Sequence, residues 1–120
     1  MASTQEQIKA AIEGFLAEVP ALANLKLVFE LELAGRGDVQ MFRVELPGPQ
    51  ITKAIAQDAR LTITMPRAQF NELAAEGTLK GYHRAYDTGH IKVNGDEQVQ
   101  KLIAQVVERQ EERARLKKAH

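Results

Sequence analysis

The ten residues GYHRAYDTGH, from Gly81 to His90, gather the side chains of this sequence that are best suited to chemistry. His83, Asp87 and His90 are spaced so that they would lie along one edge of a continuous α-helix. Imidazole and carboxylate groups both bind metal ions, so this spacing raises the hypothesis of a metal site. Gly89 is expected to end the helix first and to turn His90 away. We therefore predict no metal and no cofactor at these residues.

A second hypothesis is that His83 works as a general base with Asp87 beside it. The chain has no cysteine, and its only serine, Ser3, is expected to cap the first helix, so no nucleophile accompanies the pair. We predict that the protein is not an enzyme and that both side chains lie on the surface. A small enzyme using His83 and Asp87 is kept as an alternative.

Tyr82 and Tyr86 are four residues apart and share the apolar side of the same short helix with Leu79. One interpretation is core packing, in which each hydroxyl finds a partner near the surface. The other is that both tyrosines line a cavity and offer their hydroxyls to the head group of a ligand. The two interpretations are compatible, because the wall of a cavity is also part of a core.

The composition limits the classes of function that these residues could serve. The chain has 120 residues, which suits one domain. Its 16 basic and 16 acidic residues balance, which argues against a nucleic-acid binder. The absence of cysteine excludes disulfides and cysteine-ligated zinc. The first residues are polar, and no apolar run approaches the ~18 residues that span a bilayer, so we expect a cytoplasmic protein.

The first half of the chain reads as one helix followed by strands. Ser3 and Glu6 form a capping-box pattern that predicts a helix over about residues 4–19. Strict alternation over 25–33 predicts a half-buried strand, and 39–46 is predicted to be the returning strand of a hairpin. The segments 51–56 and 60–65 are predicted to be two further short strands.

Two short helices, a strand and a long helix are expected in the second half. Gly77 is expected to end the first short helix, Thr78 to cap the second, and Asp96 to cap the last helix. A fifth strand is predicted over 90–95. Strands and helices are segregated, so we predict an α+β fold: a five-stranded, mostly antiparallel sheet with helices packed on one face. The predicted buried stripe of the last helix is Val99, Leu102, Ile103, Val106 and Val107.

The apolar stripe stops after Val107, and the remainder of the chain is charged nearly throughout. We predict a single domain over 1–107 and a charged, helical C-terminal extension over 108–120. The simplest interpretation of the extension is a solvated helix end. The alternative is that its basic residues make transient contact with an anionic membrane surface. These residues are Arg115, Lys117 and Lys118.

The segment between Ala59 and Val107 resembles the sterol carrier protein (lipid-transfer) domain family. The resemblance rests on a strand of the type Thr-Ile-Thr-Met, a helix with an aromatic residue and a closing glycine, an alanine–aromatic pair, and a strand that ends in Gly-Asp before an amphipathic helix. Here these elements are Thr62 to Met65, Phe70, Gly77, Ala85 with Tyr86, Gly89, Ile91, Val93, and Gly95 with Asp96.

The resemblance implies an apolar cavity between the sheet and the helices that holds a lipid-like ligand without covalent chemistry. Fatty acids, acyl-CoA, sterols and isoprenoids are the ligand classes that it suggests. Tyr82, His83 and Arg84 make this short helix more polar than in many members, which hints at a ligand with a polar group. The alternative is an accessory protein-interaction module of a lipid-metabolism complex. The predicted cavity residues are Phe15, Phe29, Met65, Phe70, Tyr82, Tyr86, Leu102 and Val106.

Overall fold

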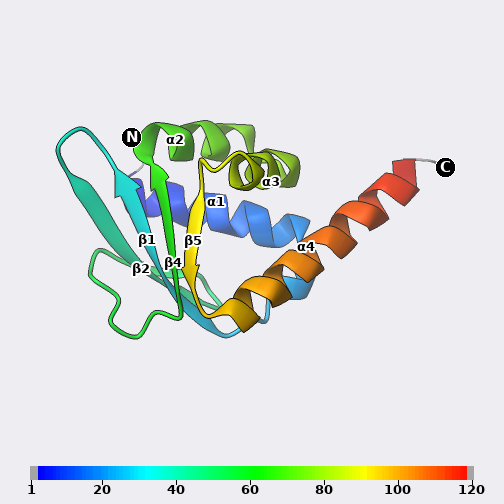
Figure 1. Cartoon of the computed structure of the whole chain (residues 1–120), viewed down its shortest axis with the longest axis horizontal. Coiled ribbons are helices and arrows are strands. Elements are labelled where there is room, and N and C mark those ends of the chain that lie inside the picture. The colour runs from blue at the N-terminus through cyan, green and yellow to red at the C-terminus, as the bar shows by residue number, and fades with distance from the viewer. Residues whose placement is uncertain (1–2, 119–120) are drawn as a thin grey trace.

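The computed structural model describes residues 3–118, with side chains up to residue 116. Over this range the chain forms a five-stranded sheet with helices beside it (Figure 1). In chain order the elements are α1 (Thr4–Glu18), a 3₁₀ turn η1 (Pro20–Leu22), β1 (Leu27–Ala34), β2 (Val39–Leu46), β3 (Gln50–Thr52), β4 (Leu61–Pro66), α2 (Arg67–Glu76), α3 (Leu79–Asp87), β5 (Lys92–Gly95) and α4 (Glu97–Lys118). The predicted α+β class is confirmed.

The strand order of the sheet is β3–β2–β1–β4–β5. β1 and β2 pair antiparallel with Phe29 opposite Val44, as the predicted hairpin requires. β2–β3 and β4–β5 are also antiparallel. The central strands β1 and β4 run parallel, with Phe29 beside Leu61. The sheet is therefore mixed, and the prediction of a mostly antiparallel sheet is corrected at its centre.

The strand predicted over 51–56 does not continue past Thr52, so residues 53–60 are free to connect the edge of the sheet to β4. Only Gln50–Thr52 pairs, at the edge of the sheet beside β2. The chain then passes over the outer face of the sheet, where the backbone N–H of Ala56 donates to the carboxylate of Glu30 over 2.9 Å. The Glu30 carboxylate thus accepts a hydrogen bond that the backbone of a neighbouring strand would otherwise accept. The segment consequently crosses to the far side of β1 and enters β4 in the same direction as β1.

The core lies between the sheet and the helical layer. Leu27, Phe29, Leu31 and Leu33 of β1 are all buried, as the alternating pattern predicts. Ile8 of α1, with no exposed surface, packs into the same cluster. Figure 1 shows α1, α2 and α3 stacked on one side of the sheet, while α4 leaves the bottom of β5 and projects beyond the body.

The predicted helix caps are found where the sequence places them. The Ser3 hydroxyl accepts the backbone N–H of Glu6 at the start of α1. Gly77 ends α2 in the left-handed conformation with φ 64°. The Thr78 hydroxyl accepts the N–H of Gly81, and the Asp96 carboxylate accepts the N–H groups of residues 98 and 99. Local side-chain chemistry therefore fixes where these helices begin and end.

α4 runs without a break across the proposed domain boundary between residues 107 and 108. The extension predicted over 108–120 is thus a continuation of the same helix, and its residues 119 and 120 lie outside the described range. None of the helices within residues 3–118 combines the length and the apolar character needed to cross a membrane.

Candidate ligand groove

An open groove of about 560 Å³ runs along the helical layer between α1 and α2, with α3 at one end. Its volume lies within the range of roughly 300–1,000 Å³ that small-molecule sites occupy. This groove lies between helices, and residues 3–116 do not show the predicted apolar cavity between sheet and helices. The groove is lined by Gln7, Ala10, Ala11, Gly14, Phe15, Arg67, Asn71, Ala74, Ala75, Gly77 and Tyr82.

Small residues on the facing sides of the two helices keep the groove open. Ala11 and Gly14 on α1 are three residues apart and so lie on one side of the helix. Ala74 and Ala75 of α2 line the groove opposite them. A Cβ atom added at Gly14 would meet no other atom within 4 Å. These residues were not predicted from the sequence, because alanine and glycine are unremarkable at helix positions. Their spacing at 10, 11 and 14 is the signal that could have found them.

Two of the predicted cavity residues, Phe15 and Tyr82, line the groove. Their rings meet edge to face, with centroids 5.4 Å apart and planes at 83°. Burial raises the pKa of the Tyr82 hydroxyl, so the group stays protonated at neutral pH and can donate a hydrogen bond. Among residues 3–116 no side chain or backbone group forms a hydrogen bond with that hydroxyl. A ligand in the groove would therefore meet an available polar group at this end.

The other predicted cavity residues lie elsewhere. Phe29, Met65 and Phe70 are buried in the main core cluster. Val106 packs from α4 against a smaller cluster that contains Val19, Leu22 and Leu79. Tyr86 and Leu102 are on the surface, with 51% and 44% of their area exposed, and line neither hollow described here. Their helical spacing predicted that Tyr86 and Leu102 would be buried. Few residues of other elements cover α3 and α4 at these positions, so both side chains are exposed.

The polar end of the groove is formed by Arg67, the first residue of α2, which the sequence analysis did not single out. Its Nη1 donates to the side-chain oxygen of Gln40 over 2.7 Å, and its Nη2 donates to the Thr4 hydroxyl over 3.0 Å. These bonds tie α2 to β2 and to the start of α1. Both acceptors are uncharged.

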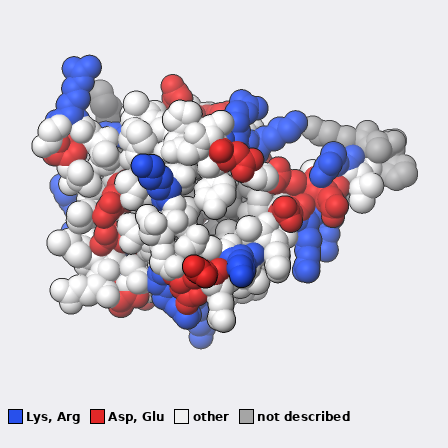
Figure 2. All heavy atoms as spheres, viewed as in Figure 1, with Lys and Arg blue, Asp and Glu red and all other residues white. Residues whose placement is uncertain are grey.

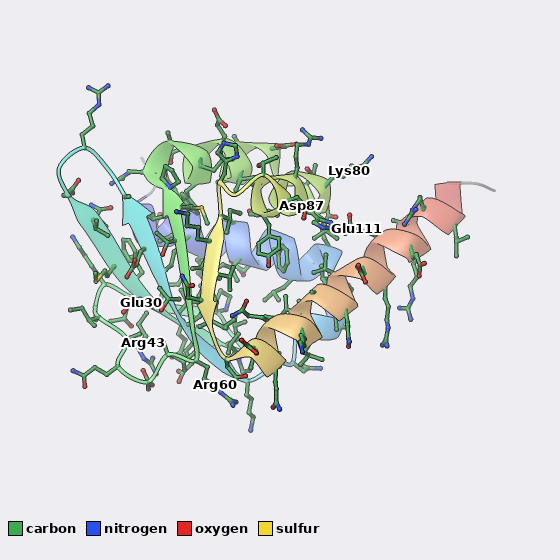
Figure 3. The ribbon with its side chains drawn as sticks, viewed as in Figure 1. Glu30, Arg43, Arg60, Lys80, Asp87 and Glu111 are labelled. Carbon is green, nitrogen blue, oxygen red and sulfur yellow. The ribbon has the colours of Figure 1, made fainter. Side chains whose placement is uncertain are left out.

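The histidine cluster that opened the sequence analysis joins two helices. His83 Nδ1 lies 2.5 Å from a carboxylate oxygen of Glu111 on α4, and Nε2 lies 3.4 Å from Asp87. The two carboxylates bind opposite edges of the ring, so they do not converge on one point. His90 is apart from them and contacts the Thr88 hydroxyl. Within residues 3–116 no three metal-binding side chains come together (Figure 3 labels Asp87 and Glu111).

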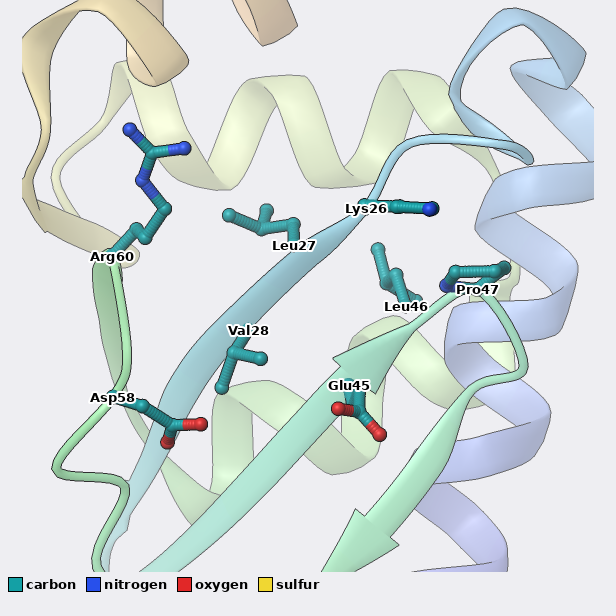
Figure 4. A pocket seen from close by; sticks show the side chains of 8 residues that line it. All are labelled: Lys26, Leu27, Val28, Glu45, Leu46, Pro47, Asp58 and Arg60. Carbon is teal, nitrogen blue, oxygen red and sulfur yellow. The ribbon is translucent and has the colours of Figure 1, made fainter.

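A second hollow, of about 390 Å³, lies where β1 and β2 meet the chain entering β4 (Figure 4). Leu27, Val28 and Leu46 form its apolar part. Its rim carries charges of both signs, and several are already paired. Arg43 binds Asp58 over 2.6 Å, and this bond holds the pKa of the Asp58 carboxyl below its usual value. Arg60 likewise binds Asp96 over 3.0 Å.

Charged side chains are unevenly spread over the molecule. Figure 2 shows them gathered along the projecting part of α4, while much of the body in that view is uncharged. Of the three residues predicted to contact a membrane, Lys117 and Lys118 have side chains outside the described part. Arg115 stands among acidic neighbours such as Glu111 and Glu112. Nothing in the described part of the chain supports that contact.

Comparison with solved structures places the fold among the sterol carrier proteins. Palmitated SCP2L2 from Aedes aegypti aligns with a TM-score of 0.59 and 20% identity over 83% of this chain and 93% of that chain. Sterol carrier protein 2 from Yarrowia lipolytica, in its apo form, aligns with a TM-score of 0.55 and 20% identity over 78% and 87%. A structure described as the UbiJ-SCP2 ubiquinone synthesis protein aligns with a TM-score of 0.50 and 18% identity over 92% and 97%.

No model of a protein family matches the sequence, and no curated protein matches it. The resemblance that was based on residues 59–107 is thus confirmed by structure, at the level of the fold. It extends beyond that segment, because the alignments cover at least 78% of the chain.

Proposed function

We propose that this protein binds a lipid-like ligand in the groove between α1 and α2 and carries it without chemical change. The observation that supports this most directly is the groove itself: about 560 Å³, lined by small residues and with Phe15 and Tyr82 at one end. One structure with this fold is described as palmitated. A fatty-acyl chain is accordingly the first ligand class to test, followed by acyl-CoA, sterols and isoprenoids.

The physics of such a site is simple. Apolar surface transferred out of water contributes roughly 25 cal/mol per Å², so a chain of a few methylenes lying against the alanines and Phe15 is held by several kcal/mol. One or two polar groups then suffice to fix its orientation. The groove has such groups at both ends, Tyr82 at one and Arg67 at the other. The buried residues Phe29, Met65 and Phe70 would support the groove from below.

Filling the groove tests the proposal. Gly14→Leu places a side chain where a Cβ meets nothing within 4 Å, so the variant should fold and block the groove. We expect freshly purified wild-type protein to release a lipid on organic extraction, seen by native mass spectrometry, and to bind a fluorescent fatty-acyl probe. Gly14→Leu should lose both properties.

The matched control is Glu13→Leu, which adds the same side chain at an exposed neighbouring position that does not line the groove. It should keep probe binding. Equal binding by wild type, Gly14→Leu and Glu13→Leu would show that the ligand, if bound, does not occupy this groove.

A second candidate function is that of an accessory module in a lipid-metabolism complex. It is favoured by the structure described as a ubiquinone synthesis protein, which spans 92% of this chain, and by the projecting charged part of α4. A wild-type protein that carries no lipid and ignores fatty-acyl, sterol and isoprenoid probes would favour this candidate over a carrier. A small enzyme based on His83 has less support, because Glu111 and Asp87 already engage both ring nitrogens.

A further inference from the structure

We propose that Arg67 anchors an anionic head group, so that the ligand of the groove is a long-chain anion with its head at the start of α2 and its chain directed toward Phe15 and Tyr82. This inference rests on the proposed function, because it assigns a chemical class and an orientation to the ligand of the same groove. It adds a specificity-determining residue that neither the motif nor the aromatic pattern indicated.

The charge of Arg67 favours an anionic ligand. A guanidinium has five N–H donors and keeps its charge at any physiological pH. Two donors are used in the bonds to Gln40 and Thr4, which are neutral acceptors. The ion pairs formed within residues 3–116 do not include Arg67. A partly buried cation at a ligand groove thus retains both its charge and donors with which to bind an anion.

Arg67 is held in place by its hydrogen bonds to Gln40 and Thr4. Its two bonds reach β2 on one side and the first residue of α1 on the other, over 2.7 and 3.0 Å. A guanidinium that is already oriented loses little side-chain entropy when it binds a carboxylate or phosphate in its planar, two-pronged geometry. The Gln40 and Thr4 bonds therefore prepare the head-group site before any ligand enters.

The residues that line the groove change from polar at one end to aromatic at the other. Arg67, Gln7 and Asn71 lie at or near the start of α1 and α2, whereas Phe15 lies toward the end of α1. α2 has no acidic residue in its first turn that would neutralise Arg67, and the nearest acid on the first turn of α1, Glu6, is exposed. From Arg67 to Gly77 the helix rises roughly 15 Å, so the path is long enough for an alkyl chain rather than a head group alone.

The test compares ligands that share one chain and differ only in the head group. Dodecanoate, dodecyl phosphate, dodecanol and dodecyltrimethylammonium are used to displace a fluorescent apolar probe from the full chain. Wild type should bind both anions roughly 10- to 100-fold more tightly than the alcohol, the range expected when a hydrogen-bonded charge is gained. The cation should bind most weakly. Whichever anion binds more tightly identifies the head group as a carboxylate or a phosphate.

Arg67→Gln should abolish most of the preference for anions while leaving the affinity for dodecanol unchanged. Lys9→Gln is the matched control, because it removes the same charge from an exposed position of α1 that does not line the groove; it should keep the preference. The ranking of head groups by wild type needs no variant, so the proposal remains testable even if Arg67→Gln does not fold.

Equal binding of the alcohol and the anions by wild type would overturn the role of Arg67 and leave the proposed carrier function standing. An equal loss of all four ligands in Arg67→Gln would also overturn it, because the residue would then support only the shape of the groove. If wild type bound none of the four ligands, this inference would fail, and the proposed carrier function would then depend on the sterol and isoprenoid probes.

Discussion

Gly14 and Gly95 have opposite surroundings, and they should respond oppositely to one added methyl group. At Gly14 a Cβ meets nothing within 4 Å, whereas at Gly95, with φ +122°, it would lie 2.3 Å from the carbonyl oxygen of Arg60. Gly14→Ala should raise the free energy of unfolding by about 1 kcal/mol, the difference in helix propensity. Gly95→Ala should lower it by at least roughly 1–3 kcal/mol, because the backbone there is both strained and crowded.

Chemical denaturation of the two alanine variants against wild type measures these changes. A destabilised Gly14→Ala would mean that the space beside α1 is filled in solution. An unaffected Gly95→Ala would contradict the close approach of β5 to residue 60.

Asp96 should make stability depend on pH. The N–H groups of Val99 and Gln98, together with Arg60, hold the pKa of its carboxyl below the ordinary value. Because the folded pKa is lower than the unfolded one, the stabilisation is complete above the ordinary pKa of about 3.9 and is lost as the pH falls through the folded value. Asp96→Asn keeps a helix cap but does not titrate.

The melting temperature of wild type should therefore exceed that of Asp96→Asn at neutral pH, and the difference should shrink below about pH 4. Thermal melts from pH 7 to pH 2.5 check this expectation. A difference that is independent of pH would show that the charge of Asp96 does not contribute.

At the scale of elements, the helix ends were predictable because each depends on residues close in sequence. Ser3, Gly77, Thr78 and Asp96 each act within three or four positions of themselves. The pairing of β4 with β1 was not predictable in this way, since alternation shows which face of a strand is buried but not which neighbour it has. The bonds that hold the crossing segment, such as that between Glu30 and Ala56, join residues far apart in sequence.

The candidate site was predictable only where large residues form it. Phe15 and Tyr82 were selected because aromatic side chains at helical spacing mark an interior surface. The alanines and Gly14 add little to a hydrophobic pattern and were therefore not selected. The sequence of Arg67 and its neighbours is that of an ordinary surface cation, and its neutral partners, Gln40 and Thr4, are known only from the structure. Tyr86 and Leu102 carry the right pattern but lie on helices whose outer sides have too few neighbours to cover them. The predicted cytoplasmic location stays a prediction.

Glu30 should be one of the groups that hold the crossing segment 53–60 to the sheet, beside the Arg43–Asp58 pair and the bond from the N–H of Arg60 to the carbonyl of Val28. This carboxylate is 8% exposed and accepts the N–H of Ala56. Glu30→Ala leaves that N–H without its partner, which costs roughly 1–3 kcal/mol for a buried group. Limited proteolysis should then cut within 53–60 faster than in wild type. Glu32→Ala, on the same outer face but bonded only to the Thr64 hydroxyl, serves as the control and should be cut at the wild-type rate.

At the scale of the whole molecule, α4 makes few contacts with the rest of the protein for a helix of its length. Its residues up to 116 contribute no buried side chain to either core cluster, although Val99, Ile103, Val106 and Val107 pack against them. Over residues 108–116 the side-chain hydrogen bond with the body is that between Glu111 and His83. The projecting part should therefore add little to stability.

Removal of residues 108–120 tests the proposed domain boundary. The truncated chain should fold and keep probe binding, with a melting temperature lowered by less than about 8 °C, since a partly exposed ion pair contributes at most about 1 kcal/mol. His83→Ala in the full chain should reproduce most of that decrease. A truncated chain that does not fold would show that α4 and the sheet form one unit up to its end.

The parallel pairing of β1 with β4 has a consequence for how the chain reaches this structure. β1 and β2 are joined by a short turn, so their hairpin can close with little loss of chain entropy. Phe29 and Leu61 lie far apart in sequence, so their pairing closes a much longer loop. Contacts between distant residues slow folding in this way. A substitution such as Phe42→Leu in the hairpin should therefore slow refolding, whereas Ile63→Val in β4 should mainly accelerate unfolding, and stopped-flow measurements separate the two.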